Sequence, residues 1–229
     1  MNLIIIFVVC LFIISFYIDY NHVIMNNISS IKNISSENSK YFIDTTYFII
    51  YKFINTMFIG IAIGSYVVQY EPIRIDDFPI MGIVFSILTI PIALLYQKIM
   101  TIDYFFKFLL VVEFIMLIWI TLFLIYPYSY QIALLIYIAR NITFLFGDFL
   151  GRAETLFLKK KNILSSIDVA KQIGMIFGMI FSVVFYKWIE NVYLISDNQG
   201  KVYYVHFILI ILQVMIIFSV FKAFKKISS

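Results

Sequence analysis

The stretch Gly174-Met-Ile-Phe-Gly178 lies inside a long apolar segment at about 172–189. Its spacing places two residues without side chains about one helical turn apart on one helix face. Helices can approach closely there, which matters in a bilayer because lipid gives no hydrophobic drive for helix association. Six of the eight glycines form pairs of this kind, each in a different apolar segment: Gly60/Gly64, Gly147/Gly151 and Gly174/Gly178. The pairs predict a packed bundle of membrane helices with these glycines at the helix contacts.

The composition gives the same protein class. Hydrophobic residues make up 63% of the 229 residues, charged residues 13%, and the mean hydropathy is +0.98. Soluble domains contain about 45–50% apolar and about 25% charged residues. A soluble all-helical protein would also need polar faces on its outer helices, and almost no segment shows one. We therefore expect an all-α, polytopic integral membrane protein, of a bacterial inner membrane in preference to an organellar inner membrane.

Seven apolar stretches have roughly the 17–25 residues needed to cross a hydrocarbon core. They lie at about 3–18, 47–69, 79–97, 107–126, 131–151, 172–189 and 204–221. We interpret 1–18 as a separate N-terminal transmembrane helix, because Met1-Asn2 lacks the positive charge that opens a signal peptide. The Asn- and Ser-rich segment 19–46 predicts a polar linker. Residues 47–229 are then expected to form a six-helix membrane bundle with a short basic C-terminal tail.

Lysine and arginine predict the orientation, because cytoplasmic loops carry an excess of them. If the C-terminus is inside, twelve of these residues lie in the cytoplasmic segments and three, Arg74, Lys187 and Lys201, lie outside. Seven crossings then place the N-terminus outside. The formal net charge of +4 mostly reflects this bias. We expect the Lys159-Lys-Lys161 run to be a topogenic loop rather than a lipid or nucleic-acid site, because no aromatic residues are interleaved with it.

Two charged residues inside the predicted spans are the first candidates for function, because a charge in hydrocarbon is costly unless it is paired or hydrated. Glu113 lies in the fourth span and Arg140 in the fifth, and a tight turn at Pro127-Tyr-Ser-Tyr130 joins the two. Counted from that turn, their depths differ by only about 5 Å, at 1.5 Å per residue. The two side chains can therefore meet, either as a buried ion pair that fixes helix register or as a pair linked to substrate or proton movement.

The fifth span also carries Asn141, Thr143 and Asp148, and Asp148 follows Arg140 by close to two helical turns. This polar stripe would line a hydrated path if it faces the bundle interior, or form interhelical hydrogen bonds beside Gly147/Gly151 if it faces another helix. The predicted substrate or ion path thus consists of Arg140, Asp148, Glu113 and Asn141. His206, near the end of the last span, is expected to be interfacial rather than catalytic.

Signatures of enzymes are missing from the sequence. It has no phosphate-binding loop, no His-Glu-x-x-His and no Gly-x-Ser-x-Gly elbow. Cys10 is its one cysteine, which removes disulfides and thiolate metal sites. We expect no enzymatic activity, no cofactor and no bound metal.

The segment from about 47 to 221 resembles one six-helix half of a major facilitator superfamily transporter. The resemblance is carried by Arg140-Asn-Ile-Thr-Phe-Leu-Phe-Gly147, Arg152-Ala-Glu-Thr-Leu-Phe157 and Asp168-Val-Ala-Lys-Gln-Ile-Gly174-Met-Ile-Phe-Gly178. In that family the corresponding helices carry an arginine-to-glycine run and small residues for tight packing, and exchange occurs by rocking between two such halves. A single half implies a split, truncated or dimerising transporter, or an inactive relative.

Two functions therefore remain open. The first is a secondary-transporter-like protein that moves a small solute. The second is a non-catalytic structural or assembly subunit of a larger membrane complex, such as a respiratory complex, suggested by the separate first span and the missing catalytic motifs. The expected partners are the lipid bilayer and a second copy or a partner membrane subunit, with no nucleic acid.

Overall fold

The structure is a computed structural model that describes residues 39–227. The predicted span at 3–18 and most of the predicted linker lie outside the described residues. The described part is almost entirely helical and includes six helices that are long and apolar enough to cross a membrane. These are α2 (Thr45–Ala62), α4 (Asp77–Leu94), α6 (Ile102–Ile125), α7 (Tyr130–Phe157), α8 (Lys161–Tyr193) and α9 (Asn198–Ala223).

Each of the six helices overlaps one predicted span, but the ends differ. Residues 158–160 alone separate α7 from α8, so most of the predicted cytoplasmic segment 152–171 is helical. These helices contain 28 and 33 residues, or about 42 and 50 Å at 1.5 Å per residue. Because a hydrocarbon core is about 30 Å thick, their polar ends extend beyond it. Hydropathy detects only the apolar part of such a helix.

The first predicted span of the bundle contains a break. Helix α2 ends at Ala62, and the chain continues as the short helix α3 (Ser65–Tyr70). Gly64 lies at this break, where an added Cβ would touch only the Tyr186 ring, at 3.8 Å. A second short helix, α5 (Tyr96–Ile99), follows α4.

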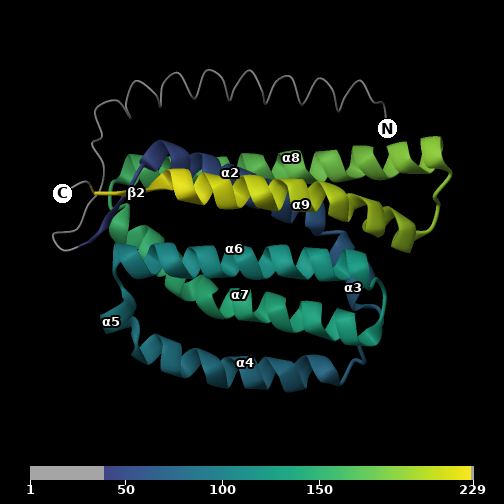
Figure 1. The fold of residues 1–229 in the computed structure, drawn as a ribbon, viewed down its shortest axis with the longest axis horizontal. Helices are drawn as coiled ribbons and strands as arrows, with labels where there is room; N and C mark the ends of the chain where they lie inside the picture. The colour runs from purple at the N-terminus through teal and green to yellow at the C-terminus, as the bar shows by residue number, and fades with distance from the viewer. Residues whose placement is uncertain (1–38, 228–229) are drawn as a thin grey trace.

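The long helices form two layers (Figure 1). Helices α2, α8 and α9 form one layer, in which α2 packs on both α8 and α9. Helices α6, α7 and α4 form the other, and α6 also packs on α9. Helix α4 lies at the outer edge, packs mainly on α7 and has no buried residue.

Helices α2 and α8 approach closely at three of the glycines singled out in the sequence. A Cβ on Gly60 would lie 2.5 Å from the Met175 carbonyl oxygen, and one on Gly178 would lie 3.0 Å from Cα of Gly60. A Cβ on Gly174 would overlap the backbone of α2 at Phe53. Any side chain at these positions would push the two helices apart, because the neighbouring atoms are backbone atoms.

The two ends of the six-helix bundle are joined. Strand β1 (Tyr41–Ile43) pairs antiparallel with β2 (Phe224–Lys226), directly before α2 and directly after α9. Asp44 caps α2 by accepting hydrogen bonds from the amides of Thr46 and Tyr47, and its carboxylate lies 2.6 Å from Nζ of Lys225. Figure 1 shows α5 and the α7–α8 connection at this same end. The end is rich in lysine, so the positive-inside rule predicts that it faces the cytosol.

Candidate functional site

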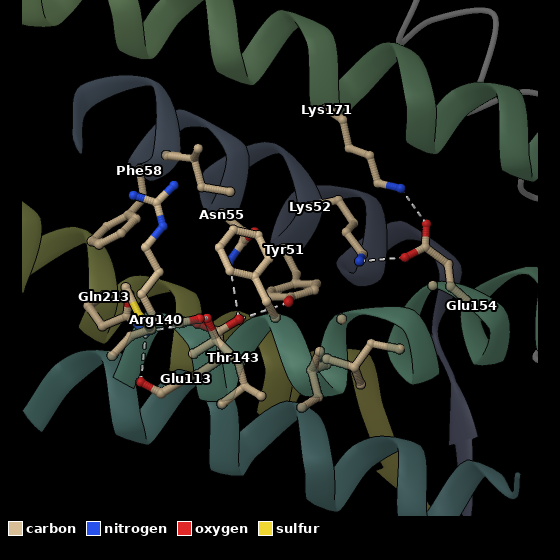
Figure 2. A pocket seen from close by; sticks show the side chains of 18 of the residues that line it. Tyr51, Lys52, Asn55, Phe58, Glu113, Arg140, Thr143, Glu154, Lys171 and Gln213 are labelled. Carbon is tan, nitrogen blue, oxygen red and sulfur yellow. Dashed lines mark hydrogen bonds and ion pairs between the residues drawn. The ribbon is translucent and has the colours of Figure 1, made fainter. Parts of the chain in front are cut away.

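A cavity of about 390 Å³ lies where the two helix layers face each other (Figure 2). Side chains of α2, α6 and α7 form most of its wall, and α3, α8 and α9 contribute one residue each. Five of the lining residues are charged: Lys52, Glu113, Arg140, Glu154 and Lys171. Charges within apolar helices are costly and mark functional sites in membrane proteins. This cavity is therefore the candidate site.

Glu113 is 2% exposed and is held by neutral hydrogen-bond donors. Its Oε1 accepts from the Tyr51 hydroxyl at 2.8 Å and from Asn55 Nδ2 at 3.1 Å. Its Oε2 accepts from Gln213 Nε2 at 2.8 Å, and the same amide donates to the Glu113 backbone carbonyl at 2.9 Å. Tyr51 and Asn55 reach one oxygen because residues four apart share a helix face. Glu113 thus connects α6 to α2 and α9.

Glu154 forms a second, ionic cluster at the end of the cavity nearest the α7–α8 connection. Its carboxylate oxygens lie 2.5 Å from Lys52 Nζ and 2.6 Å from Lys171 Nζ. The three residues come from α7, α2 and α8. Lys171 also lies 3.6 Å from the exposed carboxylate of Asp168. Two lysines share one buried carboxylate, which offsets part of the desolvation cost of all three groups.

Arg140 extends from α7 toward the other layer and stacks on aromatic rings. Its guanidinium carbon lies 3.5 Å from the centroid of the Tyr66 ring and 5.4 Å from that of Phe144. Within residues 39–227 no carboxylate lies within 4.0 Å of it, so the expected ion pair with Glu113 is not formed. Figure 2 shows both residues at the cavity with no dashed line between them. Instead, neutral donors hold the Glu113 carboxylate, while the Arg140 guanidinium lies over the Tyr66 ring of α3.

The remaining residues of the predicted path do not line this cavity. Asn141 Nδ2 donates to the Tyr137 carbonyl of its own helix at 2.8 Å. Asp148 is exposed in an open groove of about 640 Å³ beside the cavity. Eight residues make about 2.2 turns, so Asp148 is rotated about 80° from Arg140 around α7. The polar stripe therefore divides between two surfaces.

Gly147 and Gly151 line both the cavity and the groove. A Cβ added to either glycine would meet no atom within 4 Å. They are therefore not at a tight helix contact of the kind that α2 and α8 make. Their missing side chains leave space where the cavity and the groove adjoin.

His206 is buried, 2% exposed, and does not line the charged cavity. Its Nε2 lies 2.5 Å from Gln69 Nε2, and its Nδ1 lies 2.6 Å from the Val202 carbonyl oxygen. Its ring packs on that of Phe123, with centroids 4.1 Å apart. Among the described residues, no three His, Cys, Asp or Glu side chains gather as metal ligands.

The sequence reasoning missed four of the site residues that matter most. Lys52 and Asn55 lie inside the predicted span 47–69, and the rule that selected Glu113 and Arg140 would also have selected Lys52. Glu154 and Lys171 fell in the predicted loop 152–171, so their position next to a cavity had no sequence signal.

Comparisons with protein-family models, with curated proteins and with solved structures found no match.

Proposed function

We propose that this chain is a membrane transport protein that binds a small solute in the charged cavity and moves it across the bilayer. The observation that carries the proposal is a cavity of about 390 Å³ with five charged residues, lined by five of the six helices of membrane-spanning length. A volume of this order suits a small ligand, since ligand pockets measure roughly 300–1,000 Å³. A purely structural bundle has no need for charges around an open space, because burying them costs free energy.

The detailed geometry favours solute binding over a role in helix register. A register pair would seal Arg140 against Glu113, whereas the Arg140 guanidinium instead borders the cavity without a carboxylate partner among the described residues. Half-satisfied charges at membrane depth are typical of substrate and ion pathways.

The proposal includes a transporter architecture of the major facilitator type. The chain would supply one six-helix body, with its two ends joined on one side by β1 and β2. Rocking exchange needs two such bodies, so the second would be another copy of this chain or a partner membrane subunit.

Uptake into liposomes tests the proposal. The purified full chain is reconstituted and given a panel of radiolabelled sugars, amino acids, organic acids and amines. At least one solute should accumulate faster than in protein-free liposomes, and Arg140→Leu should abolish this uptake. Arg74→Leu is the matched control, because the Arg74 side chain is 75% exposed and does not line the cavity. Uptake that survives Arg140→Leu, or no uptake of any solute, contradicts the proposal.

An assembly subunit is the alternative, and one observation favours it. Helix α4 has no buried residue and exposes Ile83, Ile87 and Ile90 at about 60% each, a surface that lipid or another subunit would cover. Native electrophoresis in mild detergent separates the two functions. Stable co-migration with a large complex would support the subunit, whereas a monomer or homodimer argues against it.

A further inference from the structure

We infer that the cavity accepts a small organic anion whose carboxylate binds the guanidinium of Arg140. The inference rests on the proposed function for the claim that the ligand is transported, but the binding chemistry is argued from the cavity alone.

The charges around the cavity leave a net positive site. Glu154 is shared by Lys52 and Lys171, so that cluster holds one more positive than negative charge. Arg140 adds a second cation, and Glu113 is the only other carboxylate in the described lining. If Glu113 is ionised the lining carries one net positive charge, and if it is protonated the lining carries two. The sign is positive in both cases, which attracts anions and repels cations.

Arg140 is the group with unused binding capacity. Stacking on the Tyr66 ring offsets part of the cost of holding a guanidinium at this depth. The planar guanidinium still presents a fork of N–H donors that matches a carboxylate with two parallel hydrogen bonds. An anionic ligand would therefore supply the counter-charge that no described side chain supplies.

The wall near Arg140 distinguishes an organic anion from an inorganic one. Tyr66 and Phe144 contact Arg140, and Phe58 and Met116 add further apolar surface to the cavity lining. A carboxylate with a short aliphatic or aromatic body would bury apolar surface on these side chains while its charged end meets Arg140. Chloride or phosphate would leave the apolar wall uncovered.

Charge-selective labelling of a cavity cysteine tests the sign of the site. Cys10→Ser removes the native thiol, and Thr143→Cys places a new one of similar size in the lining. The anionic and the cationic methanethiosulfonates of similar size are compared, each rate divided by its rate with free β-mercaptoethanol. The anionic reagent should react about ten-fold faster than the cationic one. Arg140→Gln should lower this ratio several-fold, and a ratio of one or less in the parent overturns the inference.

Protection of the same cysteine tests the ligand class. Benzoate should slow labelling by a neutral maleimide, while benzylamine, chloride and phosphate at matched ionic strength should not. Equal protection by chloride or phosphate would overturn the organic part of the inference, and protection by benzylamine would overturn its charge. Should Thr143→Cys fail to fold, Gly147→Cys replaces it, because nothing lies within 4 Å of a Cβ there. A Gly147→Cys thiol that reacts with neither reagent also overturns the inference.

These outcomes are separable from those of the uptake test, because labelling needs no transport. Anion-selective labelling without uptake of any solute would retain the site and remove the proposed function. Uptake of an amine that depends on Arg140, together with cation-selective labelling, would retain the proposed function and remove the anion site.

Discussion

At the scale of the residue, the charged side chains of the cavity divide into those held by hydrogen bonds or ion pairs and Arg140, which has no carboxylate partner among the described residues. Glu113 receives three side-chain donors from two helices, and Glu154 receives two lysines. Arg140 has aromatic neighbours and no carboxylate within 4.0 Å in the part of the chain that the structure describes. From this contrast we propose that the first two hold the helices together and that the third binds the solute.

Glu113→Ala should destabilise the protein strongly. The change leaves the Tyr51 and Asn55 donors without their acceptor, while Gln213 keeps its bond to the backbone carbonyl of residue 113. Each unsatisfied buried group costs about 1–3 kcal/mol. We expect the Tm in detergent to fall by about 5 °C or more, and Glu113→Gln to lower it less, because one carbonyl acceptor remains. Asp148→Asn, at an exposed position of α7, is the control and should leave the Tm unchanged. Equal Tm values for Glu113→Ala and Asp148→Asn would refute the bridging role.

Asp44 should stabilise the joined ends mainly as a helix cap. Asp44→Ala removes the acceptor for two amides of α2 and should cost about 1 kcal/mol. Asp44→Asn keeps a capping oxygen and loses only the ion pair with Lys225, so thermal unfolding should show a smaller loss. The hydrogen bond that Lys225 donates to Asp44 raises the pKa of Lys225. The stability that this ion pair contributes is complete below the ordinary lysine pKa of about 10.4, and it is lost only as the pH rises above that value. The difference between Asp44→Asn and the parent should therefore be constant from about pH 6 to 9, and a change within that range would contradict this assignment.

At the scale of the element, the glycine pairs have two different uses. Gly60, Gly174 and Gly178 lie where α2 and α8 touch through their backbones, whereas Gly147 and Gly151 border open space. Both kinds have the same spacing in the sequence. Spacing shows which helix face lacks side chains but not whether another helix or a cavity covers that face.

Alanine should destabilise the protein at one kind of glycine and not at the other. Gly178→Ala inserts a methyl group against the backbone of α2 and should cost about 1–3 kcal/mol, seen as a lower Tm in detergent. Gly147→Ala meets no atom within 4 Å and replaces a flexible residue in a helix, so its Tm should be equal or slightly higher. The same loss in both variants would show that Gly147 is packed.

The six helices of the bundle were predictable because an apolar run of about 20 residues has few other solutions. The lengths of the helices were harder to predict, because the ends of α7 and α8 are polar and a hydropathy profile detects only apolar residues. The site was predictable only in part. Glu113 and Arg140 stand out as charges in apolar runs. The side chains that contact them depend on how the helices pack on one another, and no local sequence pattern encodes that packing.

At the scale of the whole molecule, two helix layers enclose a charged cavity while their outer surfaces are apolar. Lipid would cover Ile90 of α4, which is 60% exposed, whereas Thr143 of α7 lines the cavity. The two positions lie at similar depth. Each is thirteen residues from the start of its helix, and the two starts are joined by a hydrogen bond of 2.7 Å from the Tyr130 hydroxyl to Asp77.

The most direct measurement compares a cysteine at each of these positions in protein that lacks Cys10 and is reconstituted in liposomes. A membrane-impermeant maleimide is added from each side in turn. Thr143→Cys should react from at least one side while Ile90→Cys stays unmodified, because a polar cavity admits water at a depth where the outer surface meets only lipid. Equal reaction at both positions would mean that the helices do not span the bilayer. A Thr143→Cys thiol as inert as the one at position 90 would mean that the interior is closed to water.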